Sequence, residues 1–142
     1  PSYQLPFELI DFMVVVEKRR RAPMVAAQHE EMMSEAIVKV RVNGDIMHTA
    51  AEGNGPVNAL DAALRKALLP SYPELADVKL KDFKVRILEE STGTESVVRV
   101  LIESTDGTEE WHTVGASGNL IEASWLALVD AFEYWLLKKN RP

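Results

Sequence analysis

Two stretches of the chain, His48–Leu68 and His112–Leu136, repeat one pattern of apolar and polar positions. Each begins with His-Thr, passes through a turn of small residues and continues as an apolar segment with helical spacing. The aligned pairs include His48 with His112, Thr49 with Thr113, Val57 with Ile121, Ala59 with Ala123, and Ala63 with Ala127. A fixed internal period reflects a repeated structural unit. The sequence therefore predicts a duplication in which each half ends in a strand, a turn and a helix.

Three segments of the first half have the composition or the alternation of strands. Phe12–Val16 is an apolar, largely β-branched run, and Val38–Val42 alternates valine with basic residues, the period of a strand with one buried face. Asn43-Gly44 is the sequence of a type I′ turn, so the chain is expected to reverse into a strand at Ile46–Ala50. Ala22–Glu35 has neither period and is interpreted as a long connection.

A first helix is predicted to begin at Pro56, because a missing N–H needs no partner at the first helical position. Its apolar residues recur every three or four positions, which places them on one buried face. The polar residues that are expected to face water or a ligand are Asn58, Asp61 and Arg65. Leu69–Pro73 then breaks the chain between the halves.

The second half follows the same order. The residues Phe83, Val85 and Ile87 share one strand face, and further strands are predicted at Val97–Ile102 and Trp111–Val114. The connecting turns are predicted at Ser91–Gly93 and Ser104–Gly107. A second helix opens at Asn119, a plausible N-cap with Glu122 three residues on. Because this helix is apolar nearly all round, it must be covered on most faces, by pseudo-symmetric packing of the two helices, by a second subunit or by both, and a homodimer is expected.

These elements predict an α+β fold built as an internal, pseudo-two-fold duplication of a β-β-β-α unit. The predicted boundaries are about 7–69 for the first repeat, 70–78 for a linker and about 79–139 for the second repeat, within a single domain of residues 1–142.

Composition and charge limit the classes of partner and binding site that this chain can have. The net charge of −6 disfavours nucleic acid as a partner, and the basic run Lys18–Arg21 is interpreted as a solvated loop. The chain has no cysteine, which excludes disulfides and thiolate metal sites. No apolar run approaches the roughly 20 residues of a membrane span, and no signal peptide is evident. A cytoplasmic protein is therefore expected.

The histidines and the glycine-rich segments do not complete a catalytic motif. His48 and His112 occupy equivalent strand ends, which favours a structural or interface role, and His29 lacks the second histidine of a zinc-binding helix. The segment Gly53–Asn58 fails the dinucleotide fingerprint at its last position. No catalytic residue, metal site or cofactor site is predicted in this chain.

The glycine turns before the two helices are candidate ligand loops. In Gly53–Gly55 and Gly115–Gly118, small residues leave backbone N–H groups free at a helix N-terminus, where a carboxylate is favoured. The alternative is that these glycines only make tight turns between strand and helix, and the spacing does not decide between the two.

At these residues the chain resembles a known family. Gly53–Pro56, the Leu80-x-Asp82-Phe83 strand, and Thr113–Gly115 leading into Ile121–Trp125 closely resemble the C-terminal allosteric, dimerising domain of the 2-isopropylmalate synthase and citramalate synthase family. The resemblance extends from about Phe7 to Leu137. Arg99–Ser104 followed by Ala123–Trp125 is more similar to the citramalate synthase branch, whose effector is isoleucine, than to the leucine-inhibited branch.

The resemblance implies a function for this chain as a regulator of an acyltransferase that condenses acetyl-CoA with a 2-oxo acid. That chemistry belongs to a metal-dependent (β/α)8 barrel of about 250 residues, so a divalent metal is expected only in a catalytic domain that this fragment lacks. The fragment alone is expected to be inactive, with no cofactor of its own. Its expected partners are a branched-chain amino acid, a second copy of itself and its catalytic domain.

The resemblance also assigns the residues that bind the effector, which in this family lies near the interface between two regulatory domains. The amino-acid backbone is expected at Gly53, Asn54, Gly55, Val57 and Asn58, and the side chain at Leu80, Phe83, Ile87 and Val97. Ala116 and Gly118 join the set as the equivalent turn of the second repeat. The sequence leaves open whether isoleucine or leucine is the effector, and whether the domain is an oligomerisation module without a ligand.

Overall fold

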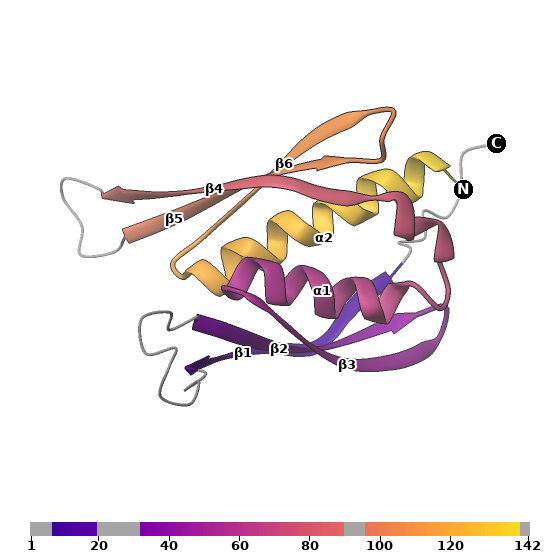
Figure 1. Ribbon diagram of the computed structural model, residues 1–142, viewed down its shortest axis with the longest axis horizontal. Helices are drawn as coiled ribbons and strands as arrows, with labels where there is room; N and C mark the ends of the chain where they lie inside the picture. The colour runs from indigo at the N-terminus through magenta and orange to yellow at the C-terminus, as the bar shows by residue number, and fades with distance from the viewer. Residues whose placement is uncertain (1–6, 20–31, 90–95, 140–142) are drawn as a thin grey trace, which may run out of the picture. The chain divides into compact units, whose positions relative to one another are not determined.

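The computed structural model describes residues 7–19, 32–89 and 96–139, and the chain divides into two compact units with the same order of elements (Figure 1). One unit runs from Leu9 to Ser71 and the other comprises essentially the chain from Tyr72 onward. The elements of the first are β1 (Phe7–Arg19), β2 (Met32–Val42), β3 (Asp45–Asn54) and α1 (Pro56–Leu68). The second contains the 3₁₀ helix η2 (Pro73–Asp77), β4 (Lys79–Glu89), β5 (Ser96–Thr105), β6 (Glu110–Ser117) and α2 (Leu120–Lys139). Each unit has a three-stranded sheet, in the orders β1-β2-β3 and β4-β5-β6, which confirms the predicted α+β fold of repeated β-β-β-α units.

The β2–β3 hairpin forms at the predicted turn. Asn43 and Gly44 have φ angles of 50° and 84°, as a type I′ turn requires, and Val42 pairs with Asp45. The interpretation of Ala22–Glu35 as a connection is wrong at its end, because β2 begins at Met32. Ser34 and Ala36 are buried and continue the inward-facing positions of the strand. Their small side chains gave no hydrophobic signal in the sequence, although the alternation continues through them.

The predicted first strand, Phe12–Val16, is too short. β1 spans Phe7–Arg19, so the charged residues that begin at Glu17 do not end it. β1 lies at an edge of its sheet, where charged residues are tolerated and discourage pairing with other chains. The basic run, interpreted as a solvated loop, begins within β1 at Lys18 and Arg19, so that interpretation is wrong for these two residues. Arg20 and Arg21, the predicted turn at Ser91–Gly93 and His29 fall outside the described residues.

Each helix packs on one face of the sheet in its own unit. α1 contacts β2 and β3, and α2 contacts β6 and β5. The largest fully buried side chains of the first unit include Val38, Val40, Leu60 and Leu64, and those of the second include Ile102, Leu128, Phe132 and Leu136. Burying a Val, Leu, Ile or Phe side chain stabilises a fold by about 1.5–3 kcal/mol. These two cores therefore fix the position of each helix on its sheet.

The duplication extends to individual hydrogen bonds. The hydroxyl of Thr49 donates to the carbonyl oxygen of Ala63 at 2.7 Å, and the hydroxyl of Thr113 donates to that of Ala127 at 2.7 Å. Both bonds join the last strand of a unit to its helix at the same sequence separation. The aligned pairs of the sequence therefore occupy equivalent places in the two units.

Candidate functional site

The N-terminus of α1 is open to a ligand in a way that follows from its sequence. Gly55 occupies the N-cap with φ 86° and ψ 166°, a backbone conformation that is essentially restricted to glycine. Glycine supplies no capping side chain, and the first turn contains no acidic residue. The first N–H groups of a helix have no partner within it, and the helix dipole is positive at this end. The backbone N–H groups of Val57 and Asn58 at this end can therefore donate hydrogen bonds to a carboxylate.

The other residues assigned to this turn have structural roles of their own. A Cβ at Gly53 would come within 2.6 Å of the backbone nitrogen of Ala59, so glycine is required there for the strand to approach the helix. The side-chain amide of Asn58 donates to the carbonyl oxygen of Asn54 at 2.9 Å. The side chain of Val57 is buried in the core. The accessible parts of the predicted site are thus the backbone around Gly55 and the amides of the two asparagines.

The equivalent end of α2 is closed by its own residues. The carboxamide oxygen of Asn119 accepts a hydrogen bond from the backbone N–H of Glu122 at 2.8 Å, which confirms the predicted N-cap. Glu122 also places a negative charge in the first turn. Ala116 and Gly118, which the sequence assigned to the effector site, are exposed beside this capped end. The two helix ends therefore differ, and only the end of α1 lacks a side-chain cap.

A bulge in β4 brings three of the four residues assigned to the effector side chain to one face. Leu80 pairs with Ser104, but Asp82 pairs with Glu103, so one extra residue is inserted between them. As a result Leu80, although three residues before Phe83, points to the same side of the sheet as Phe83 and Ile87. Val97 pairs with Leu88 and lies on the opposite face.

The helix-side face of β4 is apolar and largely uncovered. Phe83, Val85 and Ile87, here termed the β4 strip, pair with the buried residues of β5 that α2 covers. α2 itself packs mainly on β5 and β6. Val85 and Ile87 consequently remain 44% and 64% exposed. Exposed apolar surface of this kind is typical of a ligand or a protein contact.

One expectation for α1 is wrong. Asp61 and Arg65, predicted to face water or a ligand, have side chains that are only 16% and 18% exposed and form an ion pair at 3.4 Å. Burial raises the pKa of the Asp61 carboxyl, and the guanidinium of Arg65 opposes this rise. The two side chains are thus largely buried and paired, so the expectation that they face water is wrong.

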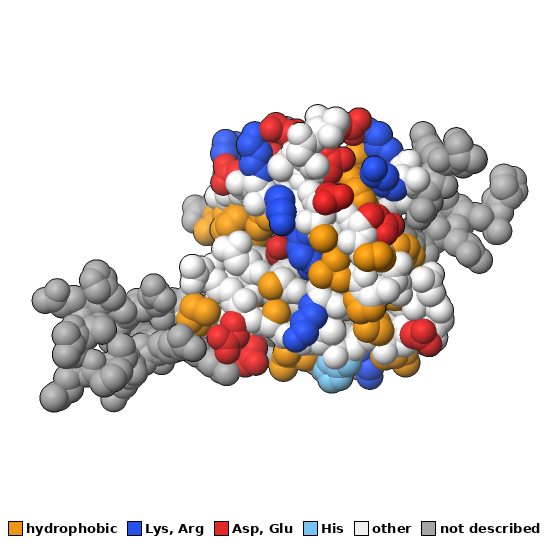
Figure 2. Space-filling view, turned by 45° about the vertical axis from the view of Figure 1, so that its right-hand side comes forward, with side chains coloured by type: hydrophobic (Ala, Val, Ile, Leu, Met, Phe, Trp, Pro, Cys, Tyr) orange, Lys and Arg blue, Asp and Glu red, His pale blue; other side chains and the backbone are white. Residues whose placement is uncertain are grey.

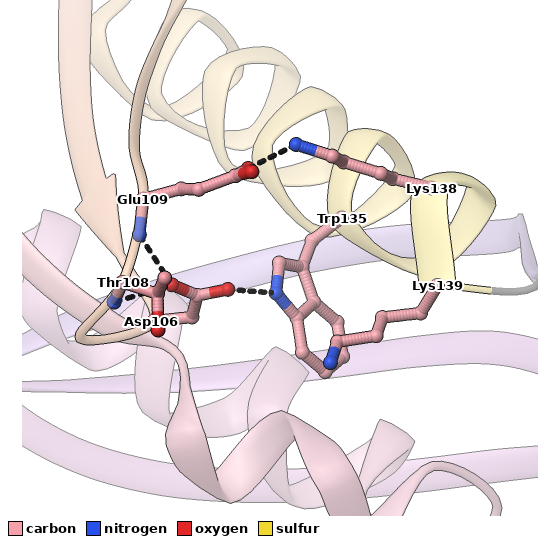
Figure 3. A pocket seen from close by; sticks show the side chains of 6 residues that line it. All are labelled: Asp106, Thr108, Glu109, Trp135, Lys138 and Lys139. Atoms are coloured by element: carbon pink, nitrogen blue, oxygen red, sulfur yellow. Dashed lines mark hydrogen bonds and ion pairs between the residues drawn. The ribbon is translucent and has the colours of Figure 1, made fainter.

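A pocket of about 320 Å³ lies where the β5–β6 turn meets the last turns of α2 (Figure 3). Asp106 accepts hydrogen bonds from the backbone N–H groups of Thr108 and Glu109, and its second oxygen accepts one from the indole of Trp135 at 3.0 Å. These bonds lower the pKa of Asp106 to about 2. Glu109 pairs with Lys138 beside them. The groups are satisfied by one another, so this arrangement fixes the turn to the helix. The sequence indicated the turn but not this role.

The described residues offer no other reactive centre. Within residues 7–19, 32–89 and 96–139, no cluster of histidine and acidic side chains could hold a metal ion. None of the helices in that part of the chain is long and apolar enough to cross a membrane. In the view of Figure 2, basic and acidic side chains are interspersed over the described surface, with hydrophobic ones between them. The candidate features are therefore two separate surfaces, the N-terminus of α1 in one unit and the apolar face of β4 in the other.

Comparison with known proteins identifies the class to which this fold and site belong. The chain belongs to the family described as the LeuA allosteric (dimerisation) domain, whose sequence profile matches residues 6–136. The regulatory, dimerising class that the sequence resemblance implied is thereby confirmed.

Particular relatives place the chain on one branch of that family. It is 53% identical over 134 residues to the (R)-citramalate synthase of Geobacter sulfurreducens, an alignment that covers 94% of this chain and 24% of the relative. It is 51% identical over 132 residues to the (R)-citramalate synthase of Aquifex aeolicus, an alignment that covers 93% of this chain and 24% of that relative. Similarity to the 2-isopropylmalate synthase of Aquifex aeolicus is lower, at 30% over 111 residues, covering 78% and 20%. The chain thus spans about a quarter of the length of the citramalate synthases that it matches.

Proposed function

We propose that this chain is the allosteric domain of a citramalate synthase and that it binds isoleucine as an end-product inhibitor. The observation that carries the proposal is the N-terminus of α1, which has a glycine N-cap, no capping side chain and no acidic residue in its first turn. An α-carboxylate fits this end because it supplies the missing acceptors and the negative charge that the helix dipole favours. The greater identity to citramalate synthases supports isoleucine over leucine.

The apolar part of the effector has a candidate surface of its own. Leu80, Phe83 and Ile87 lie on the same face of β4, and Ile87 is well exposed. A branched aliphatic side chain would bury apolar area there, and each methylene it buries contributes about 0.8 kcal/mol. Val97 is the least suitable of the assigned residues because it lies on the opposite face.

The parent protein, on this proposal, is an acyltransferase that condenses acetyl-CoA with a 2-oxo acid in branched-chain amino-acid biosynthesis. The domain regulates this reaction and does not perform it. A homodimer is part of the proposal, because the β4 strip leaves apolar surface that a second copy would cover. The isolated domain is expected to release no thiol from acetyl-CoA in the presence of pyruvate or 2-oxoisovalerate.

The second candidate is an oligomerisation module without a ligand. One observation favours it, because packing against α1 already accounts for Gly53. Isothermal titration of the domain with isoleucine, leucine and valine separates the two candidates. The proposal predicts saturable binding of isoleucine in preference to the other two. Preferential binding of leucine would indicate the leucine-sensing domain of a 2-isopropylmalate synthase. The absence of binding heat with all three amino acids would favour the oligomerisation module without a ligand.

A further inference from the structure

The sheet of the second unit has an outer face, directed away from α2, on which the charge changes sign along the strands. Cross-strand pairing arranges the outward residues in rows, because directly opposed residues of antiparallel strands share a face. Asp82 lies opposite Glu103 at one end, and Arg86 lies opposite Arg99 four residues away along β5. We term these the acidic row and the basic row. The row between them contains Lys84, which is followed across the sheet by Leu101 and Val114.

Each end row places like charges side by side, which destabilises an isolated sheet. Arg86 and Arg99 are both exposed, and within the described part of the chain neither forms an ion pair. In the acidic row, Glu103 contacts the ring nitrogen Nε2 of His112 at 3.1 Å, while Asp82 is exposed. A partner that brings opposite charges to both rows would relieve both repulsions.

The surface at the acidic row also contains a small depression. A depression of about 100 Å³ is lined by Asp82, Phe83, Lys84, Leu101, Glu103 and His112. Two carboxylates at the wall of a small hollow suit a guanidinium group, whose planar fork donates to carboxylate oxygens in pairs. Beside the hollow, Val114 is 48% exposed and provides apolar contact area. The face thus combines two carboxylates beside a hollow, two arginines without an ion pair among the described residues, and a middle row in which Leu101 and Val114 are apolar.

We propose that this face binds the same face of a second copy of the chain, about a two-fold axis that lies across the strands along the middle row. Such an axis reverses the order of the rows, so Glu103 meets the partner's Arg99 and Asp82 meets the partner's Arg86. Arg99 and Glu103 are four residues apart, or about 13 Å along a strand, and Leu101 is midway between them. Leu101 and Val114 then meet their own counterparts, with the sheets about 10 Å apart as in other face-to-face packings.

Self-complementarity is what favours a second copy over another acidic protein. A two-fold interface joins a patch to itself, so each residue pair occurs twice. Asp82 and Glu103 provide as many carboxylates as Arg86 and Arg99 provide guanidiniums. The one unfavourable pair is Lys84 against its own copy. Lys84 lies on the edge strand β4, where a long side chain can extend to water.

This contact is separate from the homodimer proposed above. The β4 strip lies on the helix side of the sheet and the three rows lie on the opposite side. Use of both faces joins one dimer to another, and the first such contact makes an assembly of four chains. The face between dimers is small and charged, so its association is expected to weaken as salt rises.

Sedimentation velocity over a range of protein concentrations tests the proposal by charge exchange. The wild-type protein should pass from two chains to four, whereas Arg99→Glu and Glu103→Arg should each weaken this step by about tenfold or more, since each substitution breaks two pairs. The double variant R99E/E103R restores both pairs with reversed polarity and should recover the four-chain species. A wild-type protein that never exceeds two chains, single variants that associate like the wild type, or a double variant that stays at two chains would each overturn the proposal.

Lys84→Leu provides a test in the opposite direction. It removes the one like-charged pair on the axis and adds apolar surface, so the four-chain species should form at lower concentration and resist salt better. Circular dichroism and urea unfolding of every variant verify that the fold is retained. Weaker association of the K84L variant would contradict the placement of the axis along the middle row.

Discussion

The glycines of the two strand-to-helix turns have different physical reasons for being glycine. At Gly115 a Cβ would come within 2.0 Å of the carbonyl oxygen of Ala123, and at Gly53 within 2.6 Å of the backbone nitrogen of Ala59. At Gly55 there is open space, and the positive φ angle alone requires glycine. Packing thus explains the first two without any ligand. Gly55 leaves a helix end without a side-chain cap, which is the feature that a ligand can use.

The packing role of Gly115 gives a direct stability prediction. Gly115→Ala should lower the free energy of unfolding by about 1–3 kcal/mol, because the added methyl forces β6 away from α2. Gly118→Ala is the matched control, since a Cβ there meets nothing within 4 Å. Urea unfolding at neutral pH measures both. Equal stability of the two variants would show that β6 does not approach α2 as closely as described.

Asp106 is expected to stabilise the protein in a pH-dependent way. Its hydrogen bonds with Glu109, Trp135 and Thr108 lower its pKa from 3.8 to about 2, so the folded state favours the ionised carboxylate. A lowered pKa contributes stability that is fully present above the unfolded value and is lost as pH falls through the folded value. Asp106→Asn should therefore be less stable than the wild type at neutral pH.

The difference between wild type and Asp106→Asn should shrink between about pH 4 and pH 2. Urea unfolding across this range, followed by tryptophan fluorescence, measures it. Asp45→Asn, an exposed carboxylate at the start of β3, serves as the control. A gap between wild type and Asp106→Asn that stays constant down to pH 2 would assign the effect to amide geometry and not to ionisation.

At the scale of elements, the sequence was most informative where a local conformation needs a particular residue. Pro56, Asn119 and the Asn43-Gly44 turn begin or connect elements as predicted, because each provides a backbone geometry or hydrogen bond that few residues can provide. Strand lengths were predicted less well. β2 extends through Ser34 and Ala36, whose burial depends on the sheet and α1 around them, and no local pattern reports that.

The repeated threonine hydrogen bonds predict equal effects in the two units. Thr49→Val and Thr113→Val each remove the hydroxyl that donates to a helix carbonyl oxygen, and each should lower the free energy of unfolding by about 0.5–1.5 kcal/mol. Thr49→Ser and Thr113→Ser keep the hydroxyl and should lose much less. Thermal and urea unfolding of the four variants provide the comparison. A large loss of stability in one unit with none in the other would show that the two units share a backbone fold but not equivalent threonine hydrogen bonds.

The two repeats have also diverged at their helix ends. The asparagine cap of α2 provides a side-chain acceptor that α1 lacks, although each helix follows the last strand of its own unit. The sequence already contained this difference, as Asn119 and Glu122 against Gly55 and Asn58. Both turns were nevertheless predicted to be ligand loops, because free backbone N–H groups were expected at both helix ends. Of the two helix ends, only that of α1 lacks a side-chain cap, which is why the proposal places the effector carboxylate there.

At the scale of the whole molecule, the site could be predicted only in part. The family resemblance supplied the residues, and β4 places Leu80, Phe83 and Ile87 on one face. Residue identities alone could not show that a bulge makes this possible or that Val97 points the other way, because both depend on the register between strands. The charged rows of the outer face could not be predicted from the sequence either, because they too depend on the register between strands.

The proposed dimer predicts a specific effect of charge on the β4 strip. Ile87→Glu places a carboxylate in surface that a second copy is proposed to cover, so the protein should sediment as a single chain at concentrations where the wild type is dimeric. Ile46→Glu is the control, because Ile46 is also exposed but lies in the other sheet. Sedimentation equilibrium measures both. An unchanged mass for Ile87→Glu would place the dimer contact elsewhere.

The most direct test of the account is inhibition by isoleucine of a complete synthase that carries this domain. An effector acts through its different affinity for two states, and a coupling of about 1–3 kcal/mol is typical. Phe83→Ala and Gly55→Asp should shift the inhibition curve to higher isoleucine concentration while uninhibited turnover is retained. Gly55→Ala, which adds backbone strain without charge, should shift it less than Gly55→Asp. If Gly55→Asp and Gly55→Ala gave the same curve as the wild type, the effector carboxylate would not bind at the N-terminus of α1.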